Sequence, residues 1–119
     1  MTSIQDLRSF IEALRQSGQL AEISKEVSMD HELADVTASL ARSEGGAALF
    51  SNVQGTDLPI FAGGVASHAR TAISLGCEPD SIIDVMGEAL ETKNGIAPTL
   101  VEKADWHDNC LTGELVDLG

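Results

Sequence analysis

Apolar residues near the N-terminus recur at intervals of three and four positions. They are Ile4, Leu7, Phe10, Ile11 and Leu14. This spacing places them on one face of a helix, because a helix completes a turn in about 3.6 residues. Thr2 or Ser3 can cap its start, with Gln5 three residues after Thr2 as in a capping box. Gly18 predicts its end, since glycine readily adopts the left-handed conformation that follows helices.

Three short apolar runs bounded by turn residues predict β-strands. They cover residues 20–24, 47–51 and 59–62. Residues 54–57 contain Gly-Thr-Asp, which is typical of a turn, so the last two strands are expected to join as a hairpin. Pro59 should lie at the start of its strand or on a sheet edge, because proline cannot donate a ladder hydrogen bond.

A second helix is predicted between the first two strands. Ser28 or Asp30 opens it, and Gly45-Gly46 closes it. Its apolar positions at helical spacing are Leu33, Val36 and Leu40.

Two further helices follow the hairpin. One covers about residues 68–75 and ends at Gly76, and the other is capped by Asp80 or Ser81. The buried face predicted for the latter consists of Ile82, Ile83, Val85, Met86 and Leu90.

Residues 99–102 and 110–112 are predicted as two last strands. Helices and strands therefore alternate irregularly, with hairpin-like joins. This order favours an α+β fold over a doubly wound parallel sheet. We expect a small mixed or antiparallel sheet packed by about four helices, in a single domain over residues 1–119.

The composition supports a core built from aliphatic side chains. Of the 119 residues 43% are hydrophobic but only 3% are aromatic, so leucine, isoleucine, valine and alanine must do most of the packing. The expected core comprises Leu7, Phe10, Ile11, Leu14, Leu33, Val36, Leu40, Leu49, Phe50, Ile60, Ile73, Leu75, Ile83 and Leu90.

The charge balance argues against a nucleic-acid partner. Nineteen acidic and seven basic residues give a net charge of −12, and no basic stripe is present to neutralise phosphates. Residues 78–119 hold ten carboxylates against Lys93 and Lys103, a net −8. Two interpretations stay open for this acidic third: a solvated surface, or a docking face for a basic partner.

No apolar run approaches the ~20 residues that span a bilayer. The first six residues also lack the basic-then-apolar layout of a signal peptide. Cys77 and Cys110 are far apart and form no C-x-x-C pair. These features predict a soluble, reduced, cytoplasmic protein without a membrane partner.

The stretch His107-Asp108-Asn109-Cys110, with Asp105 upstream, is the most metal-like part of the sequence. It offers two or three ligands, whereas structural zinc uses four in paired clusters. A polar turn is therefore the favoured interpretation. Trp106 can anchor a partner or pack over its own domain.

Two further positions invite a chemical interpretation. Cys77 would need a nearby base to act as a nucleophile, yet Glu78 beside it raises a thiol pKa, so an inert, half-buried thiol is expected. Gly63-Gly64, followed by a helix with His68 and Arg70, resembles an anion cradle, but its spacing matches no phosphate-binding motif. A strand-to-helix turn that needs two glycines is the simpler interpretation.

The remaining titratable residues give no catalytic pattern. His31 lies among acidic residues at a helix start, where exposure is expected. No pair of carboxylates is set in an apolar frame that would shift a pKa. The sequence thus assigns no catalytic, cofactor-binding or metal-binding residue to this chain.

Five stretches, in order, resemble the N-terminal region of UbiD-type decarboxylases. They are residues 6–14 with 18–20, residues 26–27 with 32–36, and residues 47–60, 70–76 and 110–118. The family uses prenylated FMN to add or remove CO₂ on aromatic and α,β-unsaturated acids. Ser74 replaces an alanine of one motif, and Ala62-Gly63-Gly64 replaces another.

The resemblance also implies what this chain lacks. The family's Glu-Arg-Glu catalytic set, and its ligands for the metal and the flavin phosphate, lie beyond the stretch that corresponds to residues 1–119. Prenylated FMN and its metal are therefore expected on a partner or on a missing portion. No residue of this sequence can be given their roles.

Three hypotheses follow. The chain is a small non-catalytic subunit with a UbiD-like catalytic subunit as its partner, or it is an N-terminal domain separated from a longer enzyme. Alternatively, it is a free-standing binding or regulatory module that kept the fold without the chemistry. In the first case, residues 103–119 are expected to offer an edge strand to the partner.

Overall fold

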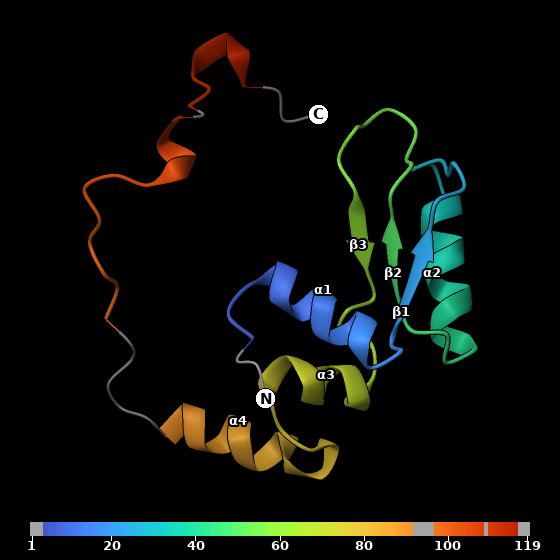
Figure 1. Ribbon diagram of the computed structural model, residues 1–119, viewed down its shortest axis with the longest axis vertical. Helices are drawn as coiled ribbons and strands as arrows, with labels where there is room; N and C mark the ends of the chain where they lie inside the picture. Colours follow the sequence, from blue (N-terminus) through green and yellow to red (C-terminus); the bar gives the residue numbers. More distant parts are fainter. Residues whose placement is uncertain (1–3, 92–96, 109, 117–119) are drawn as a thin grey trace.

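A small mixed sheet organises the computed structural model, which describes residues 4–91, 97–108 and 110–116 (Figure 1). Its strands are β1 (Leu20–Ile23), β2 (Ala47–Phe50) and β3 (Ile60–Ala62), in the spatial order β1-β2-β3. β1 pairs parallel with β2, and β2 pairs antiparallel with β3. The α+β fold with a mixed sheet is confirmed, and so are the positions of these three strands.

The connections explain the strand directions. Helix α2 (Glu32–Arg42) lies between β1 and β2 and provides the crossover that a parallel pair requires. The backbone can turn sharply just before β2 because residue 46 is glycine, with φ +92°. A Cβ there would come within 2.7 Å of the Gln19 carbonyl oxygen, which accepts the Ala47 N–H at 2.8 Å. Gly46, which was predicted to end α2, therefore also allows the backbone hydrogen bond with which the β1–β2 pairing begins.

Alternate residues of β2 face opposite sides of the sheet. Ala48 and Phe50 pack with the half-buried Leu33, Val36 and Leu40 of α2. Ala47 packs on the other side with Phe10 and Leu14 of α1 (Leu7–Gln16). In Figure 1, α2 accordingly lies on one side of the sheet, with α1 and α3 (His68–Leu75) towards the other. The core is thus two clusters separated by the sheet.

The cap of α1 differs from the prediction. Asp6, rather than Thr2 or Ser3, is the N-cap; Thr2 and Ser3 lie outside the described residues. One Asp6 carboxylate oxygen accepts the Ser9 N–H at 2.7 Å, and the Ser9 hydroxyl oxygen accepts the Asp6 N–H at 3.1 Å. This is a capping box, in which each residue satisfies a backbone donor of the other. Gly18 follows the helix as expected, with φ 71°.

The hydrogen bond from the Ser9 backbone lowers the pKa of Asp6 below its ordinary value of 3.8. The stabilisation by this carboxylate is therefore present above pH 3.8 and is lost as the pH falls through the lower, folded-state pKa. We expect Asp6→Ala to lower the midpoint of thermal unfolding at neutral pH, and the difference from wild type to shrink in strong acid. Asp57→Ala, an exposed carboxylate in the β2–β3 connection, is the matched control. A difference that stays constant into strong acid would contradict this role.

The start of α2 was predicted at Ser28 or Asp30, but the helix begins at Glu32. His31 is the N-cap and has φ 68°, without a side-chain capping bond. Glu32 instead turns back, and its carboxylate accepts the Ser28 N–H at 2.9 Å. The prediction was wrong because the two preceding polar residues belong to a turn, in which Ser28 accepts the Asp30 N–H.

The third helix agrees with the sequence, whereas the fourth is only half buried. α3 is capped by Ser67 and ends at Gly76 in the left-handed conformation. A 3₁₀ turn, η1 (Pro79–Ser81), leads into α4 (Ile82–Glu91), which contacts α3 and η1. Because these contacts cover one side of α4, Ile82 is buried while Ile83 and Leu90 are exposed.

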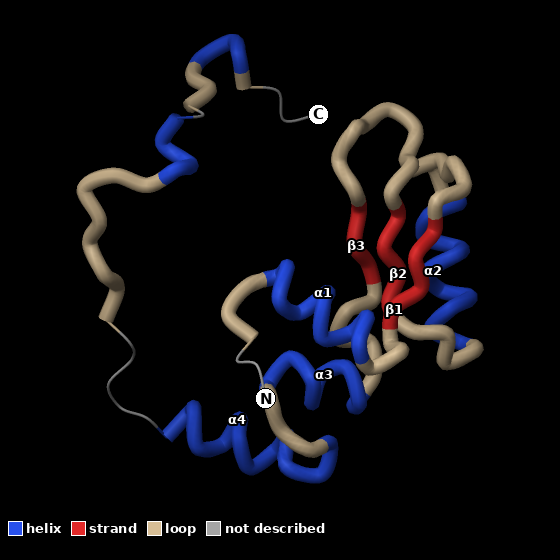
Figure 2. The backbone as a smooth tube through the Cα atoms, in the orientation of Figure 1, coloured by secondary structure: helices blue, strands red, loops and turns tan. Residues whose placement is uncertain are grey.

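The strands predicted at residues 99–102 and 110–112 are wrong. The described residues 97–108 and 110–116 contain no strand, only the 3₁₀ turns η2 (Asp105–Asp108) and η3 (Gly113–Leu115). Figure 2 shows this segment running far from the sheet. An extended run there has no neighbouring strand to pair its backbone groups. The expected edge strand within residues 103–119 is likewise absent from the described part of that range.

The predicted core is correct near the sheet and wrong at its periphery. Phe10, Leu14 and Phe50 are buried, and most of the other predicted core residues are half-buried. Four of the predicted residues are exposed, namely Leu7, Leu75, Ile83 and Leu90. Ile82 is buried as predicted for the fourth helix, and residues not expected in the core are buried as well: Val27, Ala47, Ala48, Val53, Ala72 and the charged Arg70.

Candidate functional site

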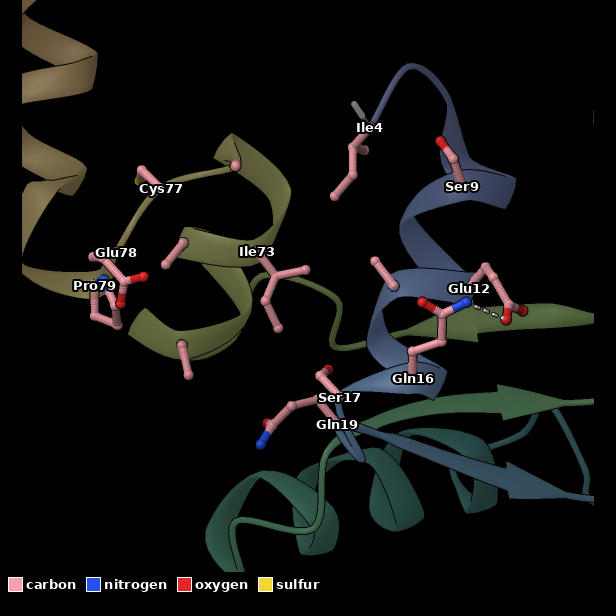
Figure 3. Close-up of a pocket in the computed structure, with 14 residues that line it drawn as sticks. Ile4, Ser9, Glu12, Gln16, Ser17, Gln19, Ile73, Cys77, Glu78 and Pro79 are labelled. Carbon is pink, nitrogen blue, oxygen red and sulfur yellow. Dashed lines mark hydrogen bonds between the residues drawn. The ribbon is translucent and has the colours of Figure 1, made fainter. Parts of the chain in front are cut away.

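A cleft of about 760 Å³ lies between α1 and the α3–η1 region (Figure 3). Ser9, Glu12 and Gln16 line it from α1, whereas Ala72 and Ile73 line it from α3. Figure 3 shows Ile73 projecting from α3 towards α1. Ile4 and Ala13 add apolar surface on the α1 side, so the polar side chains there alternate with apolar ones.

Two polar side chains of this cleft, Glu12 and Gln16, are bonded to each other within α1. The Glu12 carboxylate accepts hydrogen bonds from the Gln16 amide at 3.0 Å and from Arg15. The bond from Gln16, followed by that from Arg15, lowers the pKa of Glu12, so this residue stays ionised at neutral pH. Arg15 also forms an ion pair with Glu22 of β1 at 2.8 Å. The lowered pKa makes Glu12 a poor general acid at neutral pH.

Arg70 lies in the first turn of α3 and is buried, at 3% exposure. Its Nε donates to the Gly63 carbonyl oxygen at 3.1 Å, and a terminal nitrogen donates to the Gln19 side-chain oxygen at 3.5 Å. Within the described ranges no carboxylate lies within ion-pair distance of this guanidinium. Arg70 thus links the β3–α3 turn to the α1–β1 turn and does not face an external anion.

The Gly63-Gly64 pair has the structural role that the sequence favoured. A Cβ on Gly64 would lie 2.7 Å from the Phe61 ring and 3.1 Å from the Phe10 ring. Only glycine lets the backbone pass this closely over both rings. His68, at the exposed start of α3, and the inward-turned Arg70 do not converge on this turn as an anion cradle.

Cys77 is half-buried, as expected, and lines the far side of the same cleft next to Glu78. Figure 3 shows the two side by side after the end of α3. His68 and Arg70, the basic residues considered for activating it, are not among the residues that line this cleft. No basic side chain therefore lines the cleft beside Cys77 to act as its general base.

The described residues of the metal-like stretch lie in and after an exposed turn. Asp105, His107 and Asp108 belong to the exposed turn η2, and Cys110 is exposed after it. No group of three or more histidine, cysteine or acidic side chains in the described residues is arranged to hold a metal ion. Asn109 and the Trp106 side chain lie outside the described part, so the anchor role of Trp106 stays a prediction.

His31 is exposed, as the sequence indicated, and its Nε2 lies 3.2 Å from an Asp30 carboxylate oxygen. Neither side chain contacts the cleft.

Sequence reasoning missed the two features with the clearest structural signal. Arg70 was considered as a ligand-binding residue, although it is a buried link. The exposed apolar face of α4 was assigned to the core. The sequence did indicate this exposed face, because the apolar residues of α4 cover more of the helix circumference than a single packing surface needs.

Comparisons with known proteins found one family model and similar solved structures. Residues 11–90 match the family model UbiD_N, the 3-octaprenyl-4-hydroxybenzoate carboxy-lyase N-terminal domain. One similar solved structure is the vanillic acid decarboxylase ShVdcCD of Sedimentibacter hydroxybenzoicus in its open form, with TM-score 0.62 and 25% identity. Another is the open form of the same enzyme with truncated ShVdcD, with TM-score 0.69 and 26% identity.

The matched region is a small part of those enzymes. The two alignments cover 68% and 82% of this chain but only 18% and 22% of the decarboxylase chains. This chain therefore corresponds to about a fifth of their length. Among its described helices, none is both long enough and apolar enough to cross a membrane.

Proposed function

This chain belongs to the family of UbiD-type carboxy-lyase N-terminal domains, and from that membership we propose that it is a non-catalytic part of a UbiD-type decarboxylase or carboxylase. In this role it supports assembly with a larger, flavin-binding catalytic part. The observation that carries the proposal is the family match over residues 11–90, which spans α2, the whole sheet and α3.

The cleft does not fit the flavin that the family implies. The charged side chains among its lining residues are Glu12 and Glu78, whose sign repels a flavin phosphate. Arg70, the buried cation nearest the glycine turn, is bonded to Gly63 and Gln19. We therefore assign prenylated FMN and its metal to the catalytic part, and no step of the reaction to residues of this chain.

The substrate class is proposed from the family and from one relative. UbiD-type enzymes act on aromatic or unsaturated carboxylic acids, and the solved relatives decarboxylate vanillic acid, an aromatic acid. The same class is proposed for the enzyme to which this chain contributes. The compartment proposed for that enzyme is the cytoplasm, which is consistent with two free, unpaired cysteines.

A free-standing binding or regulatory module is the second candidate, and the cleft between α1 and α3 is the observation that favours it. Such a module would use the cleft without a UbiD-type partner. The two candidates therefore differ in what accompanies the protein in its own cells.

Purification of the tagged protein from its own cells, followed by mass spectrometry, tests the proposal. We expect a UbiD-type catalytic chain in near-stoichiometric amount, or the same residues as the start of a longer UbiD-type polypeptide. The neighbouring gene gives a cheaper check, since it should encode a UbiD-like protein without an intact copy of this region. Recovery of the chain alone, or beside a full-length enzyme with its own copy, would contradict the proposal.

A further inference from the structure

Helix α4 carries apolar residues on two adjacent stripes, of which the domain covers one. Ile82 is buried and Val85 is half-buried on the covered side. Ile83, Met86 and Leu90, which we name the apolar stripe, follow at helical spacing and are 82%, 51% and 85% exposed. Large apolar side chains aligned on one exposed helix face are typical of a docking surface.

The apolar stripe lies within an acidic segment. No lysine, arginine or histidine occurs between Thr71 and Glu91. Five carboxylates occur there: Glu78, Asp80, Asp84, Glu88 and Glu91. With about 3.6 residues per turn, Asp84 and Glu91 flank the stripe on one side of α4, so a surface that covers the stripe meets negative charge along that edge.

This charge excludes two possible occupants. A second copy would pack the same acidic rim against itself in a two-fold contact, and each copy carries a net −12. The C-terminal segment of this chain is also acidic, with Glu102, Asp105, Asp108 and Glu114 against Lys103. Its own leucines, including Leu100 at 96% exposure, do not cover the stripe in the structure. The occupant must come from elsewhere and carry the opposite charge.

We propose that the apolar stripe docks into a hydrophobic groove, edged by lysine and arginine side chains, on the UbiD-type catalytic part. This inference rests on the proposed function and adds which surface makes the contact. The family match extends through residue 90, so the stripe belongs to the shared domain. In the solved relatives most of the chain lies outside the matched region, which leaves ample protein to supply such a groove.

The apolar centre and the acidic rim make separate contributions. Burial of Ile83 and Leu90 supplies most of the affinity, because fully desolvated apolar anchors dominate interfaces. Asp84, between them in sequence, contributes to the association rate and to its dependence on salt.

The test measures binding of this chain to the UbiD-type catalytic chain that purifies with it. The double variant Ile83→Ser/Leu90→Ser is expected to bind at least about tenfold more weakly. Its thermal unfolding should match wild type, because both side chains are already exposed in the free chain. Asp84→Lys is expected to slow association and to reduce its salt dependence. Leu58→Ser, at an equally exposed leucine in the β2–β3 connection, is the matched control and should bind as wild type does.

The outcomes separate this inference from the function on which it rests. If wild type binds and the double variant binds within about twofold of it, the docking surface is wrong and the proposed function stands. If wild type binds no UbiD-type chain, both fall. A dimer of this chain that the double variant dissociates would identify a second copy as the occupant and overturn the inference.

Discussion

Replacing Phe10 with alanine should cost about 3–5 kcal/mol of unfolding free energy, the usual loss for a buried phenylalanine. Phe10 is 8% exposed and packs with Leu14 and Ala47 between α1 and the sheet. Its ring also meets Phe61 edge-on, with 6.1 Å between centroids and 84° between planes. The substitution removes this contact and leaves a cavity that the rigid strand beneath cannot fill. Denaturant unfolding monitored by circular dichroism measures the loss.

Leu7→Ala provides the matched control on the same helix. Leu7 shares the apolar periodicity of α1 but is 57% exposed, so its truncation should cost less than about 1 kcal/mol. Where Phe10→Ala leaves too little folded protein to measure, Phe10→Leu should show a smaller loss in the same direction. Equal losses at Phe10 and Leu7, or a loss below about 1 kcal/mol at Phe10, would contradict the packing described.

Arg70→Ala should cost about 2–4 kcal/mol, because it leaves buried acceptors without their charged donor. The main partner is the Gly63 carbonyl oxygen at 3.1 Å; the bond to Gln19, at 3.5 Å, is the weaker one. Loss of the buried aliphatic stem adds to the effect. Since the two partners lie in different turns, we expect faster hydrogen exchange at both the α1–β1 and the β3–α3 connections.

Two comparisons keep this prediction specific. His68→Ala, at an exposed position of the same helix, should change stability by less than about 0.5 kcal/mol. Arg70→Met retains the stem and removes the donors, so it should recover only the packing part of the loss. A stable Arg70→Ala protein with weakened phosphate binding would instead restore the anion-site interpretation of the glycine turn.

The sequence predicted most helices and strands up to α3 because local residue patterns and tertiary packing favour the same structure there. The periodicity of α1, the apolar runs of β1–β3 and the glycine after α3 each act within a few residues. The two last strands were wrong because their residues have strand-like composition but no partner strand. A strand is a property of a pair, and the pairing cannot be read from one segment.

The candidate site was harder to predict than the fold. The apolar face of α4 has the same residue types whether it is covered by its own domain or by another chain, so pattern alone placed Ile83 and Leu90 in the core. Arg70 was considered for ligand binding because a buried arginine bonded to backbone has no local sequence signal. In both cases the role of the side chain depends on the residues that it packs against in the folded protein. The family resemblance rests on ordered motifs along the chain, and the match to the family model confirms it over residues 11–90.

The central claim, that this chain assists a UbiD-type enzyme without holding its cofactor, is tested most directly by flavin content. The 119-residue chain should be produced in cells that make prenylated FMN, both alone and together with the catalytic chain recovered beside it. We expect no flavin absorbance and no CO₂ release from aromatic acids for the chain alone, and flavin on the catalytic chain of the complex. Near-stoichiometric flavin on the isolated 119 residues would contradict it.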